Sequence, residues 1–128
     1  MASSLLRKND RKSVGCPVES ALHAIGGRWK ALIIHYLLAG PQRFGQLTRL
    51  LKGVSARTLT RQLRELEECG VIDRFVHQQI PPKVEYSLTP LGQRLRPILV
   101  AMHDWGEEIE KRRGQSNPRR RMPRARPV

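Results

Sequence analysis

The sequence predicts a mainly α-helical (α+β) fold with one small β-hairpin. Two observations carry this prediction. Apolar residues recur at helical spacing over most of residues 17–109, and the period changes to the alternation typical of strands only between residues 71 and 88. The chain has 128 residues, which suits one ordinary domain whose core needs neither a metal nor disulfide bonds.

Two helices are expected at the start of this domain. Apolar residues repeat at helical spacing over residues 17–25, where Pro17 suits the first helical position and two glycines follow. A second apolar stripe covers residues 29–38 and stops before Gly40 and Pro41. Residues 42–44 then leave room only for a short bridging strand segment.

A helix-turn-helix is expected between Phe44 and Gly70, with the turn at Gly53. In its second helix Ser55 is the predicted N-cap, because a serine hydroxyl accepts from the free amide groups of a first helical turn. Gly70 is the predicted C-terminal stop.

The second helix of this pair has two distinct faces. The face expected to be buried consists of Ala56, Leu59, Leu63 and Leu66, at i, i+3, i+7 and i+10. The opposite face carries three arginines, with Thr58 beside them; the arginines are Arg57, Arg61 and Arg64. Arginine grips guanine edges or holds phosphates, and threonine contacts a thymine methyl group or a phosphate. The outward face therefore suits the major groove of duplex DNA.

The same arginines have a plainer interpretation as a solvated helix face. Exposed arginines are often paired with carboxylates one turn away, as Arg61 and Arg64 would be with Glu65 and Glu68. The elements that follow this helix favour the interpretation as a DNA-binding face.

Two strands are expected after Gly70. Residues 71–78 and 84–88 alternate as strands do, and the connection QQIPPK contains two prolines that exclude regular pairing at its tip. A helix-turn-helix followed by such a hairpin is a winged helix, with residues 78–84 as the wing. Arg74 and Lys83 are candidates for contact with the DNA backbone or the minor groove.

One long helix is expected to close the domain, with Thr89 as its N-cap, Pro90 as its first residue and Pro97 bending it. Its apolar stripe is longer than a domain of this size covers, which predicts a partner helix from a second copy. The expected homodimer interface consists of Leu95, Leu99, Met102 and Trp105. The alternative is that this helix folds onto its own domain.

The formal net charge of +13 lies mostly at the two ends of the chain. Residues 1–15 carry +3 and residues 111–128 carry +8, which leaves +2 for residues 16–110. We therefore expect a flexible basic arm at residues 1–15, a DNA-binding and dimerisation domain at residues 16–112, and a disordered Arg/Pro-rich tail at residues 113–128. Basic tails raise the affinity for nucleic acid without selecting a sequence.

Four segments between Cys16 and Trp105, taken in order, resemble one known family. They are CPVESALHAIGGRWKALIIHYLLAGPQRFGQL, VSARTLTRQLRELEECGVIDR, PPKVEYSLTPLGQRL and the tryptophan of the last helix. Together they are similar to the HxlR-type winged-helix transcriptional regulators of bacteria and archaea. The resemblance implies a homodimer, joined through its terminal helices, that binds an inverted-repeat operator with recognition helices in major grooves and wings alongside. It also favours repression over activation.

Carried over to this chain, the resemblance makes residues 55–69 the recognition helix. A two-fold protein reads two half-sites about one helical turn apart. The predicted DNA-binding set then consists of Arg57, Thr58 and Arg61 at bases or adjacent phosphates, Arg64 at phosphate, Ser55 at the helix start, and Arg74 and Lys83 in the hairpin.

Cys16 is the candidate redox sensor. It precedes Pro17 at the start of a helix, where the macrodipole and the free amide groups favour a thiolate. Several members of the family that the chain resembles sense oxidants or electrophiles through a cysteine in this position. The hypothesis is that a small-molecule oxidant or electrophile acts on Cys16 and releases the DNA. The alternative is a quiet, partly buried thiol, and Cys69 is expected to be structural.

The residue pattern excludes the common kinds of catalytic and metal site. No glycine-rich phosphate loop follows a strand, no GxSxG occurs, and the four histidines and two cysteines lack the spacing of a ligand set. We therefore expect a protein that is not an enzyme and that uses no metal and no cofactor. No apolar run approaches the roughly 18 residues of a membrane span, and no signal peptide pattern is present, so a cytoplasmic protein without membrane contact is expected.

The alternative function is a general basic nucleic-acid-binding protein, associated with RNA or with the nucleoid, that acts through its tails. The near-neutral core with three outward arginines favours duplex readout instead. Aromatic residues make up only 5% of the chain, which disfavours stacking on single strands. A regulator that senses a ligand without redox chemistry is a third possibility.

Overall fold

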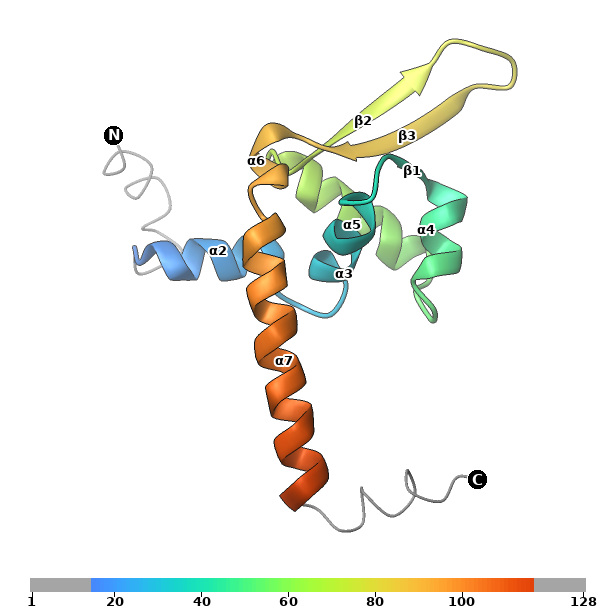
Figure 1. Cartoon of the computed structure of the whole chain (residues 1–128). Helices are drawn as coiled ribbons and strands as arrows, with labels where there is room; N and C mark the ends of the chain where they lie inside the picture. The colour runs from blue at the N-terminus through green and yellow to red at the C-terminus, as the bar shows by residue number, and fades with distance from the viewer. Residues whose placement is uncertain (1–14, 117–128) are drawn as a thin grey trace, which may run out of the picture. The chain divides into compact units, whose positions relative to one another are not determined.

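The computed structural model describes residues 15–116, which form two compact units that meet in sequence between Gln93 and Arg94 (Figure 1). Unit 1 contains α2 (Pro17–Ile25), α3 (Lys30–Leu37), β1 (Gln42–Arg43), α4 (Phe44–Leu50), α5 (Ala56–Glu68), β2 (Ile72–His77), β3 (Lys83–Leu88) and α6 (Pro90–Gln93). Unit 2 contains α7 (Arg96–Ser116). The predicted fold, mainly helical with a small antiparallel sheet, is confirmed.

The core of unit 1 is built from the apolar stripes of its helices. The fully buried large side chains are Ile33, Ile34, Leu37, Leu47, Leu51, Leu59, Leu63, Leu66 and Ile72. Ala56, which we expected on the buried face of α5, is exposed. It is the first residue of α5, and its methyl group lies on the outer surface described below rather than against the core.

The helix-turn-helix forms as predicted, with α4 and α5 joined by a turn. The Thr58 amide donates to Ser55 Oγ over 3.0 Å, which confirms Ser55 as the N-cap of α5. Gly53 in the turn has a φ of 92° and Gly70 after α5 has a φ of 79°. Both angles lie in the left-handed region that side chains other than glycine rarely adopt, so the two glycines fix the entry to α5 and the exit from it.

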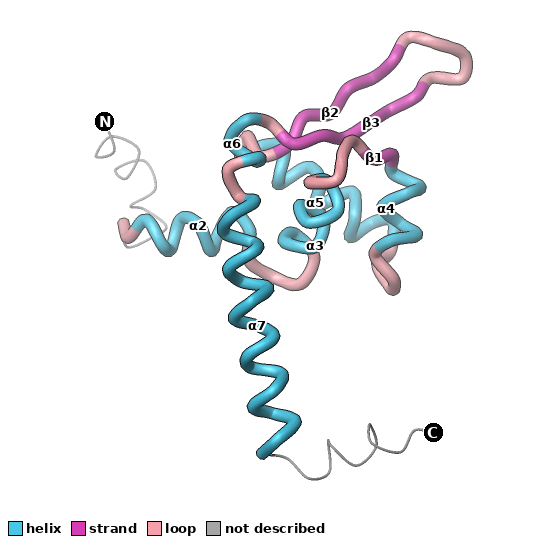
Figure 2. Tube along the Cα trace, viewed as in Figure 1, coloured by secondary structure: helices cyan, strands magenta, loops and turns pink. Residues whose placement is uncertain are grey.

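The three strands form an antiparallel sheet in the order β1-β3-β2. The hairpin of β2 and β3 ends in a loop at residues 78–82 (Figure 2). We expected the wing loop to extend to residue 84, but Lys83 and Val84 already pair with His77 and Val76 in the strands. The two prolines break the pairing only in the loop itself, so the strands are longer than the sequence suggested.

The base of the hairpin is closed by α6. Thr89 caps α6, as predicted, because the Gly92 amide donates to Thr89 Oγ1 over 3.0 Å. The same hydroxyl donates to the Gly70 carbonyl oxygen over 2.6 Å. A Cβ atom added at Gly92 would lie 2.2 Å from the Val71 carbonyl oxygen, so a glycine at this position is what lets α6 pack against the start of β2.

The single long helix that we expected after Thr89 is in fact two helices. A turn separates α6 from α7, and Pro97 is the second residue of α7 rather than a bend inside a longer helix. Proline is tolerated in a first turn, where the amide has no partner within the helix, and breaks a helix interior. The helix α7 continues to Ser116, four residues past the domain boundary that we expected at residue 112. Residues 1–14 of the predicted arm and residues 117–128 of the predicted tail lie outside the described residues.

A candidate nucleic-acid interface

The outer face of α5 is a basic surface. Arg57, Arg61 and Arg64 are all exposed, and together with Ala56 and Thr60 they line one shallow groove. The sequence interpretation did not include Thr60. Its position three residues after Arg57 and four before Arg64 was the available signal, because residues three and four apart are neighbours on a helix surface.

The three arginines have no acidic partners. Among residues 15–116, no carboxylate lies within ion-pair distance of their guanidinium groups. Glu65, which was the expected partner of Arg61, instead binds Lys30 of α3 with 2.7 Å between Nζ and Oε1. The hydrogen bond from Lys30 lowers the pKa of Glu65, with smaller contributions from Arg61 and His23. Among the described residues, Arg61 and Arg64 therefore form no ion pair with Glu65 or Glu68, and the solvated helix face stays an alternative.

Ser55 and Thr58 have a structural part at the start of α5. The Ser55 hydroxyl oxygen accepts from the Thr58 amide, and the Thr58 side chain is partly buried. Their contact with DNA stays a prediction.

The hairpin presents two faces with different chemistry. Side chains of directly opposed residues in an antiparallel pair lie on the same face, and successive residues alternate between faces. Arg74 is opposed by Tyr86, whereas Lys83 is opposed by His77. Because His77 is three residues from Arg74, the two cations that we predicted as DNA contacts project from opposite faces.

On the Lys83 face, the charges are paired with one another. Glu85 Oε1 accepts from His77 Nε2 over 2.8 Å, and Glu85 Oε2 lies 3.6 Å from Lys83 Nζ. The hydrogen bond from His77 is the main cause of a lowered pKa for Glu85. Arg74 is exposed and, within the described part of the chain, has no such partner. Of the two predicted contacts, the geometry favours Arg74.

Both cysteines are free and exposed. Cys16 precedes α2, where its carbonyl oxygen accepts from the Glu19 and Ser20 amides over 2.9 and 3.2 Å, and its side chain makes no capping hydrogen bond. The thiol of Cys16 is therefore accessible to reagents. The alternative interpretation of Cys16, a partly buried thiol without a sensing role, predicted less exposure. Cys69 follows α5 and is also exposed.

The helix α7 carries the predicted dimer residues. Met102 and Trp105 are 48% and 70% exposed, and they line an apolar groove with Pro97, Ile98 and Ala101. Leu95 and Leu99 are half-buried. Ile98 is 48% exposed and lies on the same stripe, as its spacing of i+4 to Met102 and i+7 to Trp105 indicates, although the predicted interface did not include it.

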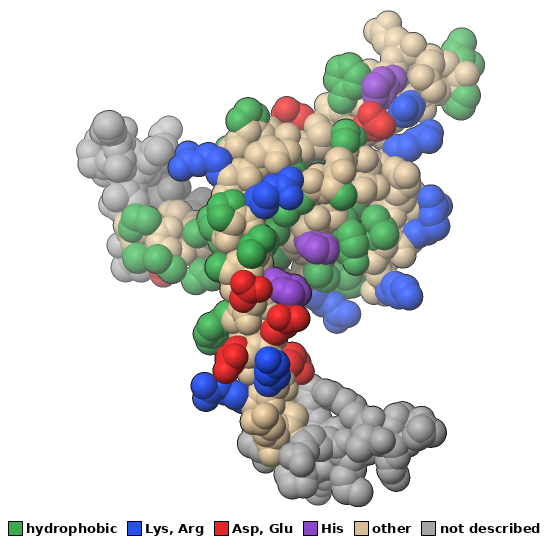
Figure 3. Space-filling view, in the orientation of Figure 1, with side chains coloured by type: hydrophobic (Ala, Val, Ile, Leu, Met, Phe, Trp, Pro, Cys, Tyr) green, Lys and Arg blue, Asp and Glu red, His purple; other side chains and the backbone are tan. Residues whose placement is uncertain are grey.

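Several charged side chains of α7 are paired along the helix. Arg112 lies 3.5 Å from Glu108, and Arg113 lies 4.0 Å from Glu110. Acidic and basic side chains lie close together on its C-terminal half (Figure 3). Although α7 has 21 residues, neither it nor any other helix within residues 15–116 is long and apolar enough to cross a membrane.

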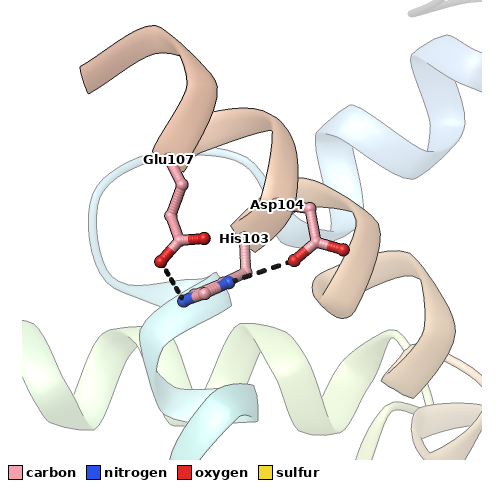
Figure 4. Close-up of side chains that lie close together, drawn as sticks. All are labelled: His103, Asp104 and Glu107. Atoms are coloured by element: carbon pink, nitrogen blue, oxygen red, sulfur yellow. Dashed lines mark hydrogen bonds and ion pairs between the residues drawn. The ribbon is translucent and has the colours of Figure 1, made fainter. Parts of the chain in front are cut away.

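One cluster on α7 combines a histidine with two carboxylates (Figure 4). His103 Nδ1 lies 3.4 Å from Asp104 Oδ1, and His103 Nε2 lies 3.8 Å from Glu107 Oε2. All three residues are exposed. The two ring nitrogens point in different directions and face different carboxylates, so an ion on either nitrogen would be turned away from one carboxylate. The geometry suits a surface ion-pair cluster better than a three-ligand metal site.

The fold, the basic helix and the hairpin match a known family model. Residues 24–113 match the model described as HxlR-like helix-turn-helix. The chain belongs to this family. The HTH-type transcriptional regulator YdeP of Bacillus subtilis is 50% identical over 98 residues, which cover 77% of each chain.

Solved structures agree with this assignment. The redox regulator HypR in its oxidized form has a TM-score of 0.69 and 47% identity, over 73% of this chain and 96% of that one. The reduced transcriptional regulator YodB from B. subtilis has a TM-score of 0.67 and 38% identity, over 73% and 92% of the two chains. As an HxlR-family member, this chain is a DNA-binding transcriptional regulator with a winged helix-turn-helix, and not an enzyme.

Proposed function

We propose that this regulator is a homodimeric repressor that binds an inverted-repeat operator, with one α5 in the major groove of each half-site. The observation that carries this proposal is the exposed face of Arg57, Arg61 and Arg64, which has no acidic partner among the described residues. Cations without partners bind phosphates or guanine edges without first breaking an ion pair. The protein acts where the chromosome lies, which is the cytoplasm in bacteria and archaea.

In this proposal the first turns of α5 read the sequence. A recognition helix contacts bases mainly through its N-terminal residues, so Arg57, Thr58 and Arg61 are placed at bases or adjacent phosphates and Arg64 at a phosphate. Glu67 and Glu68 belong to the last turn of α5, where a docked helix leaves the groove and acidic side chains cost least.

The second copy is proposed to pack along the apolar groove of α7. The apolar groove is lined by Ile98, Met102 and Trp105. The same surface of another copy can pack against it, because a two-fold interface joins identical surfaces of the two copies. Val18 and Leu22 on α2 are 65% and 61% exposed, and they offer a second apolar surface for the same purpose. Two linked copies double the contacts with the operator.

Cys16 is proposed to connect the redox state to DNA binding. HypR is described as a redox regulator, and a YodB structure is described as diamide-treated. Diamide would take two electrons and two protons from the Cys16 thiol and a second thiol, of another copy or of a small molecule, forming a disulfide and a hydrazine. A quinone would instead add the Cys16 sulfur at a ring carbon and form a thioether, and the thiol proton and the displaced ring hydrogen would end on the two oxygens of the resulting hydroquinone. Either product at Cys16 would change the start of α2 and release the operator.

The decisive experiment is selection of bound sites from a random duplex library at about 150 mM salt, where nonspecific binding is weakened. A two-fold repeat with half-sites about one helical turn apart is the expected result. Tight, salt-sensitive binding without any motif would contradict the proposal. It would favour the general nucleic-acid-binding protein that acts through its basic ends.

A truncated chain of residues 1–116 separates these two functions. This chain keeps every described element and removes the basic residues beyond α7. Sequence-selective binding by the truncated chain is expected, with lower general affinity. Loss of all binding would support the alternative.

The redox proposal is tested with Cys16→Ser, and Cys69→Ser is the matched control. Treatment with diamide or a quinone should release the operator from the wild type and from Cys69→Ser but not from Cys16→Ser. Release from Cys16→Ser would show that Cys16 is not the sensor.

A further inference from the structure

A notch of about 360 Å³ lies where α5 meets the hairpin. Its lining residues are Thr60, Leu63, Arg64, Glu67, Arg74 and Tyr86. The set comprises two guanidinium groups, two hydroxyl groups and one carboxylate around a leucine that is 2% exposed. All of these residues belong to unit 1.

The donors in this notch are not used within the protein. In the part of the chain that the structure describes, the side chains of Thr60, Arg64, Arg74 and Tyr86 make no hydrogen bond or ion pair. Tyr86 is half-buried and lines the notch, and a tyrosine hydroxyl in a partly buried position usually finds a hydrogen-bond partner. The notch is therefore rich in donors that lack an acceptor.

The notch continues the basic groove of α5. Thr60 and Arg64 line both of them. Arg74 and Tyr86 are directly opposed in the hairpin and lie on the face toward α5, while the paired cluster of Lys83 lies on the other face. A duplex that lies along α5 must carry its backbone past this junction to reach the wing.

From this geometry we infer that the notch holds one phosphodiester group of the operator backbone. Arg74 and Arg64 supply the positive charge, and the hydroxyls of Tyr86 and Thr60 donate hydrogen bonds to the phosphate oxygens. The inference rests on the proposed function, and it adds Tyr86 and Thr60 to the DNA-contacting residues. A phosphate held between helix and hairpin would fix the register of α5 on the duplex, as backbone contacts generally do.

Glu67 gives this proposal a distinctive consequence. Its carboxylate lines the same notch and repels a bound phosphate. Glu67→Gln should therefore raise the affinity for the operator by about threefold, the scale of an exposed charge interaction. A fall in affinity would contradict the proposal.

The main test combines Tyr86→Phe with operators in which single phosphates are replaced, one at a time, by neutral methylphosphonates. Tyr86→Phe removes only the hydroxyl, and it should weaken operator binding about tenfold, as expected for a hydrogen bond to a charged group. Methylphosphonate at one position in each half-site should abolish the difference between Tyr86→Phe and wild type. Tyr36→Phe, the same change in α3, is the control and should have no effect.

The charge of the notch is tested by the salt dependence of binding. Arg74→Gln should lower the slope of log affinity against log salt by about 0.9, the value for one phosphate contact. Arg112→Gln on α7, whose guanidinium group is paired with Glu108, should leave the slope unchanged, and so should Tyr86→Phe. Thermal unfolding of each variant shows that unit 1 is still folded.

Two results would overturn the inference while the proposed function stands. One is that the wild type binds its operator selectively and Tyr86→Phe binds it with the same affinity. The other is a Tyr86→Phe defect that persists equally on every methylphosphonate operator. If the wild type selects no operator at all, the proposed function fails, and the notch proposal fails with it.

Discussion

The helices α5 and α7 are both amphipathic, but their outward faces differ in how the charges are used. On α5 the guanidinium groups of Arg57, Arg61 and Arg64 are exposed and have no carboxylate within ion-pair distance among residues 15–116. On α7 the charges are paired within the helix, as in Arg112 with Glu108, and a separate apolar stripe is exposed.

Because of this difference, the two helix faces suit different binding partners. A phosphate that approaches a paired arginine must displace a carboxylate, whereas an unpaired arginine offers its full charge. An exposed apolar stripe is stabilised most by contact with another apolar surface, because burial removes both surfaces from water and lowers the free energy. The basic face of α5 therefore suits DNA, and the stripe of α7 suits a second copy.

The largest expected effect concerns the stripe of α7. Trp105→Ala should weaken dimerisation by about 3 kcal/mol, the scale of a buried aromatic residue at the centre of an interface. Sedimentation equilibrium measures the change. Val100→Ala is the control, because Val100 is 55% exposed on the opposite side of α7. An unchanged dimer dissociation constant for Trp105→Ala would contradict the proposal that the stripe of α7 binds a second copy.

The next largest effect concerns α5. Arg61→Ala should remove about 2 kcal/mol of operator binding, as expected for one specific arginine contact, and should leave the dimer intact. Arg112→Ala on α7 is the control, because it removes an arginine that is already paired. Competition binding with operator and random duplex measures both variants. Undiminished selectivity of Arg61→Ala would remove this residue from the readout set.

A smaller effect is expected for the cap that positions α5. Ser55→Ala removes the acceptor of the Thr58 amide and should lower the free energy of unfolding by about 1 kcal/mol. Thr48→Ala is the control, because the Thr48 hydroxyl donates to the Phe44 carbonyl oxygen within α4 and caps no free amide. Urea unfolding distinguishes the two variants, and equal losses would show that the cap contributes little.

The smallest effect is the pH dependence of the ion pair that links α5 to α3. Lys30 lowers the pKa of Glu65 in the folded protein, so this carboxylate stabilises the fold at neutral pH. That stability is lost as the pH falls through the lowered pKa. The Glu65 side chain is 42% exposed, which limits the contribution to about 0.5 kcal/mol.

The ion pair is tested by urea unfolding from neutral to acidic pH. Glu65→Gln should flatten the decline in stability slightly, and the control Glu68→Gln should not. Identical pH profiles for the wild type and Glu65→Gln would exclude the pair as a source of stability.

Much of the fold could be predicted from residues that act locally. The helix-turn-helix follows from the period of Leu59, Leu63 and Leu66 and from the cap at Ser55, and these signals span only a few residues. The turn that separates α6 from α7, two residues before Pro97, was missed. The apolar spacing around Pro97 is the same whether the proline bends one long helix or lies in the first turn of a new helix, so the sequence did not distinguish the two.

The sequence by itself determined most of the elements, the basic face of α5 and the family. Spacing, capping and residue type are properties of a short stretch of chain, and they act through interactions between residues that are close in sequence. The tertiary structure decided which partners those residues meet. It paired Glu65 with Lys30 instead of Arg61, set Arg74 and Lys83 on opposite faces of the hairpin, and brought Tyr86 beside Arg64. Such contacts depend on strand register and helix packing, which join residues far apart in the chain and leave no local pattern.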